Sequence, residues 1–151
     1  MITIICVGRI KEKSLKSLID EYVKRISGYA KISIVEVADE PEDRPDVLKT
    51  EGERLLKQIR KDSYVILLDL QGKEISSEQL AGKLEEITTY HSSNITFVIG
   101  GSLGVSQEVR DRADYRLKLS EMTFPHNLAR LIILEQIYRA FKINNNERYH
   151  K

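Results

Sequence analysis

The amino-acid sequence predicts an α/β fold with a mostly parallel β-sheet and helices on both faces of that sheet. Short runs rich in β-branched residues alternate with longer segments of helical periodicity along the whole chain. Several of the short runs are apolar throughout, which is typical of strands that are covered on both faces. The chain contains no internal repeat, low-complexity segment or linker, so we expect residues 1–151 to form a single domain.

The predicted strands follow from the apolar runs. Four runs are clear and the last is weaker: Ile2–Val7, Ile32–Val37, Tyr64–Leu68, Ile95–Ile99 and Tyr115–Leu119. The first run contains Cys6, the only cysteine, so no disulfide can form within the chain and we expect a cytoplasmic protein. This run is also too short to cross a bilayer and no basic residue precedes it, so we expect neither a signal peptide nor a membrane helix.

Helical spacing predicts helices between these strands and after the last one. Apolar residues recur every three to four positions over residues 15–26. A second helix is predicted over 46–61, and Gly52 on its apolar face indicates close approach of a neighbouring element. A third helix begins at the motif Ser76-x-x-Gln79, which has the spacing of a capping box. The last helix follows Pro125, and its apolar face is too broad for a surface helix.

The charge pattern and the distribution of histidines exclude some functions. The net charge of +1 argues against a protein that coats nucleic acid through bulk charge. Residues 36–53 hold eight acidic and two basic side chains, and we expect them to form a solvated loop and the start of a helix. The three histidines are dispersed and there is no cysteine cluster, so we expect no metal site.

The loops after the strands are the candidate site, because parallel α/β sheets bind ligands at the carboxyl ends of their strands. Three such loops, 69–73, 100–104 and 120–125, are expected to form one cleft. The glycine-rich loop 100–104 lacks the spacing of a dinucleotide-binding fold or a P-loop. Glycines after a strand more often form a tight turn than a ligand site, but they do allow the backbone to pass close to a ligand.

The carboxyl-terminal segment supplies further candidate residues. His126 lies at a helix start, where a histidine is as typical of a cap or a packing residue as of a catalyst. Arg130 and Arg139 are expected on the polar side of this helix, and Glu135 has the spacing for an ion pair with Arg139. A tail such as Arg148–His150 is disordered in most proteins, but this one carries a phosphate binder, a base-stacking ring and an imidazole in consecutive positions.

Six motifs occur in order along essentially the full length of the chain. They are Ile5-Cys-Val-Gly-Arg-Ile-Lys-Glu-Lys13, Leu68-Asp-Leu-Gln-Gly-Lys73, Phe97-Val-Ile-Gly-Gly-Ser-x-Gly104, Met122-Thr-Phe-Pro-His-x-x-x-Arg130, Glu135-Gln-x-Tyr-Arg-Ala-Phe-Lys142 and Tyr149-His-Lys151. This series resembles the RlmH family, the small SPOUT methyltransferases that methylate a pseudouridine of large-subunit ribosomal RNA. One departure is Asn144–Asn146, which stands where family members have a glycine; asparagine tolerates the left-handed backbone conformation better than most residues.

The resemblance implies a fold, an assembly and a cofactor. The fold is a SPOUT-type α/β knot, in which the carboxyl-terminal part of the chain threads through a loop. The assembly is a homodimer with the last helix packed on the twin subunit. The implied cofactor is S-adenosyl-L-methionine, and no metal is required. The positions that match the cofactor-binding positions of the family are Leu68, Gly100, Leu119, Ser120, Glu121, Met122, Thr123 and Phe124.

The resemblance also implies the reaction, which is methylation of N3 of a pseudouridine in the 23S rRNA of the assembled ribosome. This imide nitrogen must lose its proton before it can attack the methyl group. We expect Arg148, Tyr149 and His150 at the acceptor base, and Arg130 and His126 near the methyl donor.

Two other functions fit the same residues. One is a ribosome-associated binding or assembly factor with a vestigial cofactor pocket, because a fold does not guarantee its chemistry. The other is a nucleotide-binding α/β enzyme that uses the loop 100–104 for phosphate. This last alternative is weaker, since no phosphate-binding lysine or arginine accompanies the loop. Methyl transfer would exclude the binding factor, and competition between nucleotides and S-adenosylmethionine would test the third function.

Overall fold

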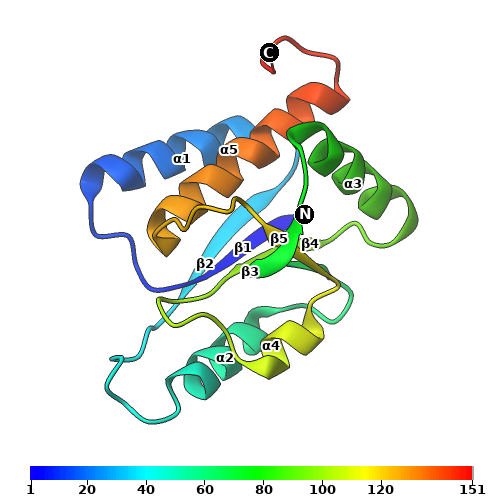
Figure 1. Cartoon of the computed structure of the whole chain (residues 1–151). Coiled ribbons are helices and arrows are strands. Elements are labelled where there is room, and N and C mark those ends of the chain that lie inside the picture. The colour runs from blue at the N-terminus through cyan, green and yellow to red at the C-terminus, as the bar shows by residue number, and fades with distance from the viewer. Residues whose placement is uncertain (151) are drawn as a thin grey trace.

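The computed structural model describes residues 1–150 and is built around one five-stranded sheet in which all neighbouring strands are parallel (Figure 1). The strand order is β2-β1-β4-β3-β5. The strands are β1 (Ile2–Val7), β2 (Ile32–Val37), β3 (Tyr64–Glu74), β4 (Ile95–Ile99) and β5 (Tyr115–Lys118). The helices are α1 (Lys13–Ser27), α2 (Val47–Gln58), α3 (Ser77–Tyr90), α4 (Gln107–Arg112) and α5 (His126–Asn144). Lys151, which ends the last sequence motif, lies outside the described residues.

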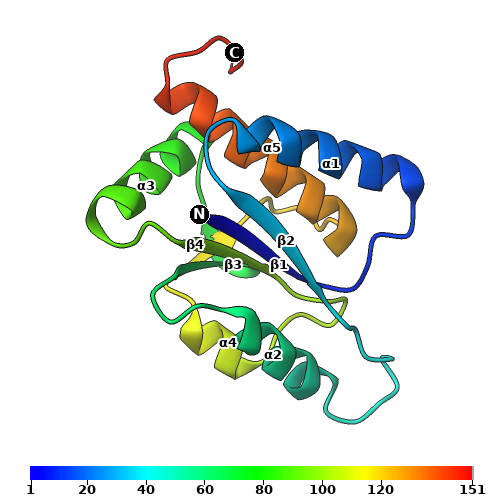
Figure 2. The same ribbon diagram turned by 180° about the vertical axis from the view of Figure 1, so that it is seen from behind.

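Helices cover both faces of the sheet, as the sequence predicts (Figures 1 and 2). On one face α5 packs between α1 and α3, and on the other face α2 packs beside α4. Alternate side chains of β1 serve the two cores: Ile4 and Cys6 face the three-helix side, while Ile5 and Val7 face the two-helix side. All four are at most 1% exposed, which explains why this strand is apolar at every position except Thr3.

Most predicted elements are confirmed with small shifts at their ends. The strands β1, β2 and β4 have the predicted bounds. Ser76 forms the predicted capping box: its hydroxyl accepts the N–H of Gln79 at 3.1 Å, and the Gln79 side chain accepts the N–H of Ser76 at 2.8 Å. Gly52 of α2 faces α4, where a Cβ would clash with the side chain of Ser106. The helix α4 itself is not predicted, because six residues are too few to show a helical repeat.

The strand β3 differs from the prediction, because it continues through 69–73, where a loop is expected. The pairing of β3 with β5 shifts register between Leu68 and Lys73, so the residues between them bulge out of the ladder. Gly72 permits this arrangement, since a Cβ at that position would lie 2.6 Å from the carbonyl oxygen of Arg116. Residues 69–71 of this bulge line a cavity that is described below.

The helix α5 is the longest of the five helices and is deeply buried. Ile133, Leu134 and Ile137 are fully buried between the sheet and the flanking helices, while Leu128 on the outer side is 40% exposed. This packing accounts for much of the broad apolar face that the sequence shows. No helix in the described part of the chain is long and apolar enough to cross a membrane.

Candidate active site

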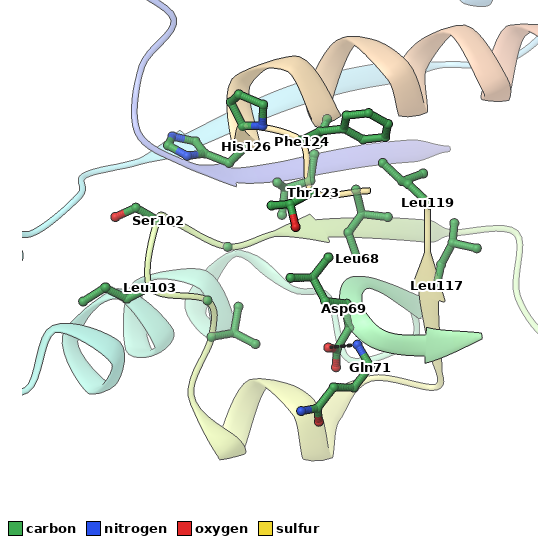
Figure 3. A pocket seen from close by; sticks show the side chains of 18 of the residues that line it. Leu68, Asp69, Gln71, Ser102, Leu103, Leu117, Leu119, Thr123, Phe124 and His126 are labelled. Carbon is green, nitrogen blue, oxygen red and sulfur yellow. Dashed lines mark hydrogen bonds between the residues drawn. The ribbon is translucent and has the colours of Figure 1, made fainter. Parts of the chain in front are cut away.

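A cavity of about 800 Å³ opens beside the bulge of β3 and at the carboxyl ends of β4 and β5 (Figure 3). Its walls come mainly from residues within 68–71, 99–105 and 117–126, which overlap the three loops 69–73, 100–104 and 120–125 that the sequence predicts to form one cleft; Arg110 and Ala129 complete the lining. The predicted cleft is therefore confirmed. The volume is in the range of sites that hold small organic ligands.

The backbone of 100–104 forms one wall of the cavity. Gly104 has a φ of +92°, in the region that favours glycine, and it pairs with Gly101 through an isolated bridge. A Cβ on Gly100 would lie 2.6 Å from Cγ1 of Val105 and 2.7 Å from the carbonyl oxygen of Gly104. Only glycine fits at position 100, and the main chain reaches the cavity there without an intervening side chain.

The same loop has the Gly-x-Ser-x-Gly spacing of the nucleophile elbow of serine hydrolases. Its geometry is different from that of an elbow. The Ser102 hydroxyl donates to Oε1 of Glu42 at 2.5 Å instead of to a histidine. Ser102 also has no positive φ, whereas the nucleophile of an elbow sits on a strained turn. The loop therefore serves as a wall and not as a source of an activated nucleophile.

The remaining lining of the cavity is mainly apolar. Its inner part consists of aliphatic and aromatic side chains, among them Leu68, Leu117, Leu119 and Phe124 (Figure 3). Leu70, Leu103 and Met122 lie at the opening, where they are 61%, 49% and 73% exposed. Such a lining can enclose a flat heterocycle, while main-chain groups of the glycine wall bond to its polar edge.

Three ionisable side chains line the cavity: Asp69, Arg110 and His126. The Asp69 carboxylate is 8% exposed, and its Oδ2 lies 3.8 Å from Nε of Arg110 and 3.5 Å from Nη1 of Arg116. His126 begins α5 and therefore enters from the other face of the sheet. Within residues 1–150, no three histidine, cysteine, aspartate or glutamate side chains gather in a way that could hold a metal ion.

The structure places seven of the eight predicted cofactor-binding residues in the cavity wall. They are Leu68, Gly100, Leu119, Ser120, Met122, Thr123 and Phe124. Glu121 is the exception, because its side chain is 84% exposed and pairs with Lys118. Of the residues predicted near the methyl donor, His126 lines the cavity and Arg130 does not.

Arg130 lies in the interior and not on the polar side of α5, so that part of the prediction is wrong. Its side chain is 2% exposed. Nη1 donates to Oε2 of Glu36 at 2.6 Å, and Nη2 donates to the carbonyl oxygen of Gly8 at 3.1 Å. The same oxygen of Glu36 accepts the N–H of Ile10 at 3.2 Å. Arg130 thus ties the start of α5 to the ends of β1 and β2. Helical periodicity cannot reveal this, because the partners are 94 and 122 residues away.

The tail packs on its own chain instead of extending into solvent. The hydroxyl of Tyr149 donates to Oε1 of Glu135 at 3.2 Å, and its ring packs edge-on against Tyr138 with centroids 4.8 Å apart. Glu135 and Arg139 form the predicted ion pair. Burial raises the pKa of Tyr149 above its ordinary value, so the phenol stays protonated at neutral pH.

His150 is held at both ring nitrogens. Nδ1 lies 2.9 Å from Nη1 of Arg139, and Nε2 lies 2.6 Å from Oε1 of Glu78. Because arginine can only donate, Nδ1 is the acceptor and the proton of the neutral imidazole sits on Nε2, facing Glu78. The contact with His150 lowers the pKa of Glu78 below its ordinary value.

A left-handed residue turns the tail back onto α5. Asn146 has a φ of +54°, and the next residue, Glu147, donates its N–H to the carbonyl oxygen of Lys142 at 2.9 Å. An asparagine therefore adopts the conformation that glycine adopts most easily. The replacement of the family's glycine by Asn144–Asn146 is compatible with an ordered turn.

The cavity and the tail lie at opposite ends of α5 (Figure 1). His126 begins the helix beside the cavity, and the tail follows Asn144 at the other end. A helix of 19 residues is roughly 28 Å long. None of Arg148, Tyr149 and His150 lines the cavity. Within one chain, the structure does not bring the predicted acceptor-side residues to the predicted donor site.

Arg110 is a cavity residue that the sequence analysis does not single out. It belongs to α4, which is too short to be predicted, and it reaches the cavity only because α4 packs beneath the glycine loop. One feature of the sequence could have indicated Arg110 as a site residue: it is the first basic residue after the loop that follows β4.

Comparisons with known proteins define the class to which this fold and cavity belong. A sequence family described as "Predicted SPOUT methyltransferase" matches residues 1–150. The chain belongs to the SPOUT methyltransferase family, and its fold is the α/β knot of that family, with the five-stranded parallel sheet described above.

Individual relatives have a more specific name than the family. The ribosomal RNA large subunit methyltransferase H of Carboxydothermus hydrogenoformans is 53% identical over 157 aligned positions, which cover 99% of each chain. The protein of the same name from Alkaliphilus oremlandii is 54% identical with the same coverage. A solved structure of "a probable methylase family protein" from Haemophilus influenzae Rd KW20 matches with a TM-score of 0.56. It is 18% identical and the match covers 99% of this chain and 70% of that one, so this likeness concerns the fold alone.

Proposed function

We propose that the protein transfers a methyl group from S-adenosyl-L-methionine to N3 of a pseudouridine in the 23S rRNA of the assembled ribosome. One observation carries the proposal: residues at seven of the eight cofactor positions expected from the motifs line a single cavity. The names of relatives at 53% and 54% identity, which are ribosomal RNA large subunit methyltransferases, support ribosomal RNA of the large subunit as the substrate. The choice of N3 of a pseudouridine rests on the motif resemblance.

The cavity suits this cofactor in shape and chemistry. The main chain at Gly100 borders the cavity and can bond to the edge of an adenine, and Leu68, Leu119 and Phe124 offer apolar surface for its faces. The cofactor, when bound, supplies a methyl group that is already activated by a sulfonium. The protein then has two tasks, which are to align the acceptor nitrogen and to remove its proton.

We infer that the protein works as a homodimer in which the tail of one subunit reaches the cavity of the other. The length of α5 separates the tail from the cavity of its own chain, as described above. Leu18 on α1 and Leu128 on α5 are 50% and 40% exposed, and these helices pack side by side, so they offer apolar surface to a second copy.

The residues of the tail differ in what they can do. In its docked arrangement His150 cannot take the N3 proton until it releases Arg139, because its Nδ1 already accepts a hydrogen bond. Arg148 is exposed and can stabilise the anion that forms when the base is deprotonated. Tyr149 or His150 then stacks on the base or relays its proton. His126 supports the donor side of the reaction, and Arg130 acts through the position of the start of α5.

We also propose that residues 1–151 act as one domain, that the ribosome is the partner beyond the second subunit, and that the protein works in the cytoplasm. The absence of a membrane-spanning helix in the described residues is compatible with this location.

The test of the proposed reaction is methyl transfer from labelled S-adenosylmethionine to ribosomes that lack the modification. Mass spectrometry of nuclease fragments should find one added methyl group on a pseudouridine of the large-subunit RNA. A methyl group on a different base would contradict the assignment to N3. Cofactor binding without any transfer to ribosomes or isolated subunits would favour the binding-factor alternative.

The shared site has a separate test by complementation. A variant with a distorted cavity wall, Gly100→Ala, and a variant with an altered tail, His150→Ala, should each be inactive alone. Mixed by co-refolding in equal amounts, they should recover about a quarter of wild-type activity, because half of the dimers are mixed and each has one intact site. No recovery, with mixed dimers shown to form, would contradict a site shared between subunits.

A further inference from the structure

We propose that Arg110 binds the carboxylate of the cofactor, so that the α4 side of the cavity is the subsite for the amino-acid end of S-adenosylmethionine. The inference rests on the proposed function. Arg110 lies in the cavity wall, its buried Nε–H has no partner, and the carboxylate nearest to it is shared with Arg116.

The position of Arg110 separates it from the other cationic candidate in the wall. Arg110 belongs to α4, on the two-helix face of the sheet, whereas His126 begins α5 on the three-helix face. Figure 3 shows Asp69 and Gln71 directed toward α4, and His126 at the opposite side of the cavity beside the start of α5. A ligand that fills the cavity therefore meets the two groups with different parts of its structure.

The guanidinium of Arg110 has an unused donor. Its Nε is buried and has no hydrogen-bond partner among residues 1–150. The nearest carboxylate oxygen, Oδ2 of Asp69, is 3.8 Å away, which is too far for a hydrogen bond. Arg112, two residues further along, donates through Nη2 to the carbonyl oxygens of Arg60 and Ser63 at 3.1 and 3.0 Å. Arg130 has a buried Nε without a partner as well, but its Nη1 and Nη2 donate to Glu36 and Gly8. Of these three arginines only Arg110 lines the cavity. Buried donors without acceptors are rare in native proteins, so Arg110 lacks an acceptor that a ligand can provide.

The charge balance around Asp69 indicates what kind of acceptor is missing. Asp69 accepts the N–H of Gln71 through Oδ1 at 2.9 Å, and its Oδ2 is approached by Arg116 as well as by Arg110. One carboxylate is thus shared between two guanidinium groups, that of Arg116 outside the cavity wall and that of Arg110 within it, so Arg110 has no carboxylate partner of its own. In S-adenosylmethionine the sulfonium and the ammonium are positive and the nucleoside is neutral, so the carboxylate is the one anionic group. An arginine and a carboxylate form the strongest class of hydrogen-bonded pair in proteins.

Calorimetric binding of three ligands to the whole protein tests the assignment. S-adenosylhomocysteine has the carboxylate, decarboxylated S-adenosylmethionine lacks it but keeps the amine and the methylsulfonium, and 5′-methylthioadenosine lacks the whole amino-acid end. Arg110→Met should weaken S-adenosylhomocysteine by about 10- to 100-fold and leave the other two ligands within about twofold. Arg110→Lys should retain part of the affinity. The matched control is Arg116→Met, which removes a charge from the same carboxylate but lies outside the cavity wall, and it should bind all three ligands like the wild type.

The outcomes separate this inference from the function on which it rests. Failure of the wild type to bind S-adenosylhomocysteine and S-adenosylmethionine would overturn the proposed function and the subsite with it. Equal weakening of all three ligands by Arg110→Met, or no weakening of any, would overturn the subsite alone. Tighter binding of ADP than of S-adenosylhomocysteine, lost in Arg110→Met, would also overturn it, because the guanidinium would then serve a phosphate. Thermal unfolding of each variant shows that the comparison is made between folded proteins.

Discussion

Substitutions at Arg130 and at Glu36 should destabilise the protein by unequal amounts. Arg130 is 2% exposed and Glu36 is 36% exposed, so the two charges differ in their access to water. In Arg130→Met the carboxylate of Glu36 can be hydrated, and the main loss is a charge-assisted hydrogen bond worth about 1.5–3 kcal/mol. In Glu36→Leu the guanidinium remains buried without its counter-charge, which costs about 3–5 kcal/mol. The N–H of Ile10 loses its acceptor in the second case as well.

Urea unfolding followed by far-ultraviolet circular dichroism measures these differences, provided that all variants are compared at one protein concentration. The double variant Arg130→Met/Glu36→Leu should be more stable than Glu36→Leu alone, because it no longer buries an isolated charge. A larger loss of stability in Arg130→Met than in Glu36→Leu would refute the reasoning from burial. A double variant less stable than either single variant would refute it as well.

The remaining predictions concern the cavity, one helix and the tail. Gly100→Ala should abolish the calorimetric signal for S-adenosylhomocysteine, because the new Cβ would lie 2.6 Å from Cγ1 of Val105; normal affinity would contradict the described wall. Gly82→Ala should raise the free energy of unfolding by about 0.5–1 kcal/mol, since Gly82 lies inside α3 with open space around it, and it should leave ligand binding unchanged. His150→Ala should lower turnover at least ~10²-fold with cofactor affinity unchanged if the imidazole assists proton transfer, and a near-normal single-turnover rate would exclude that role. The same variant should raise the pKa of Glu78 toward its ordinary value in an NMR titration, because the hydrogen bond to His150 is the main cause of the lowering. The contact of His150 with Glu78 therefore supports the docked tail above the ordinary carboxyl pKa and is lost as the pH falls through the lowered pKa.

The sequence predicts those parts of the molecule that follow from a pattern of neighbouring residues or from a general rule for parallel sheets. The runs that form β1 and β4 are bounded correctly because these inner strands are buried on both faces and are therefore largely apolar. The edge strand β2 is only partly buried, and its β-branched residues mark it instead. The cavity is predicted because parallel strands end at one edge, so that loops far apart in the sequence share a site. The capping box at Ser76 is found because its two partners are three residues apart.

The features that the sequence does not predict depend on distant partners or on short elements. Arg130 looks like a surface residue until the fold brings Glu36 and Gly8 to it. The extension of β3 depends on the register of β5, which no pattern within β3 specifies. Arg110 is not predicted as a site residue because α4, to which it belongs, is only six residues long and shows no helical repeat. The tail is ordered by Glu78, Glu135 and Arg139, and only the last two are close to it in the sequence.

The contacts of Arg130 also bear on how the chain folds while it is being made. The first strand pair is synthesised long before Arg130, which follows Glu36 by 94 residues and Gly8 by 122. Until the start of α5 has emerged from the synthesising ribosome, the carboxylate of Glu36 lacks Arg130 as its partner, and the loop after β1 is held only by its own hydrogen bonds to β2. The contacts around β1 and β2 are therefore completed only by residues from the last quarter of the polypeptide. A chain that stops before residue 126 should be bound by chaperones and cleaved by proteases more readily than the full chain.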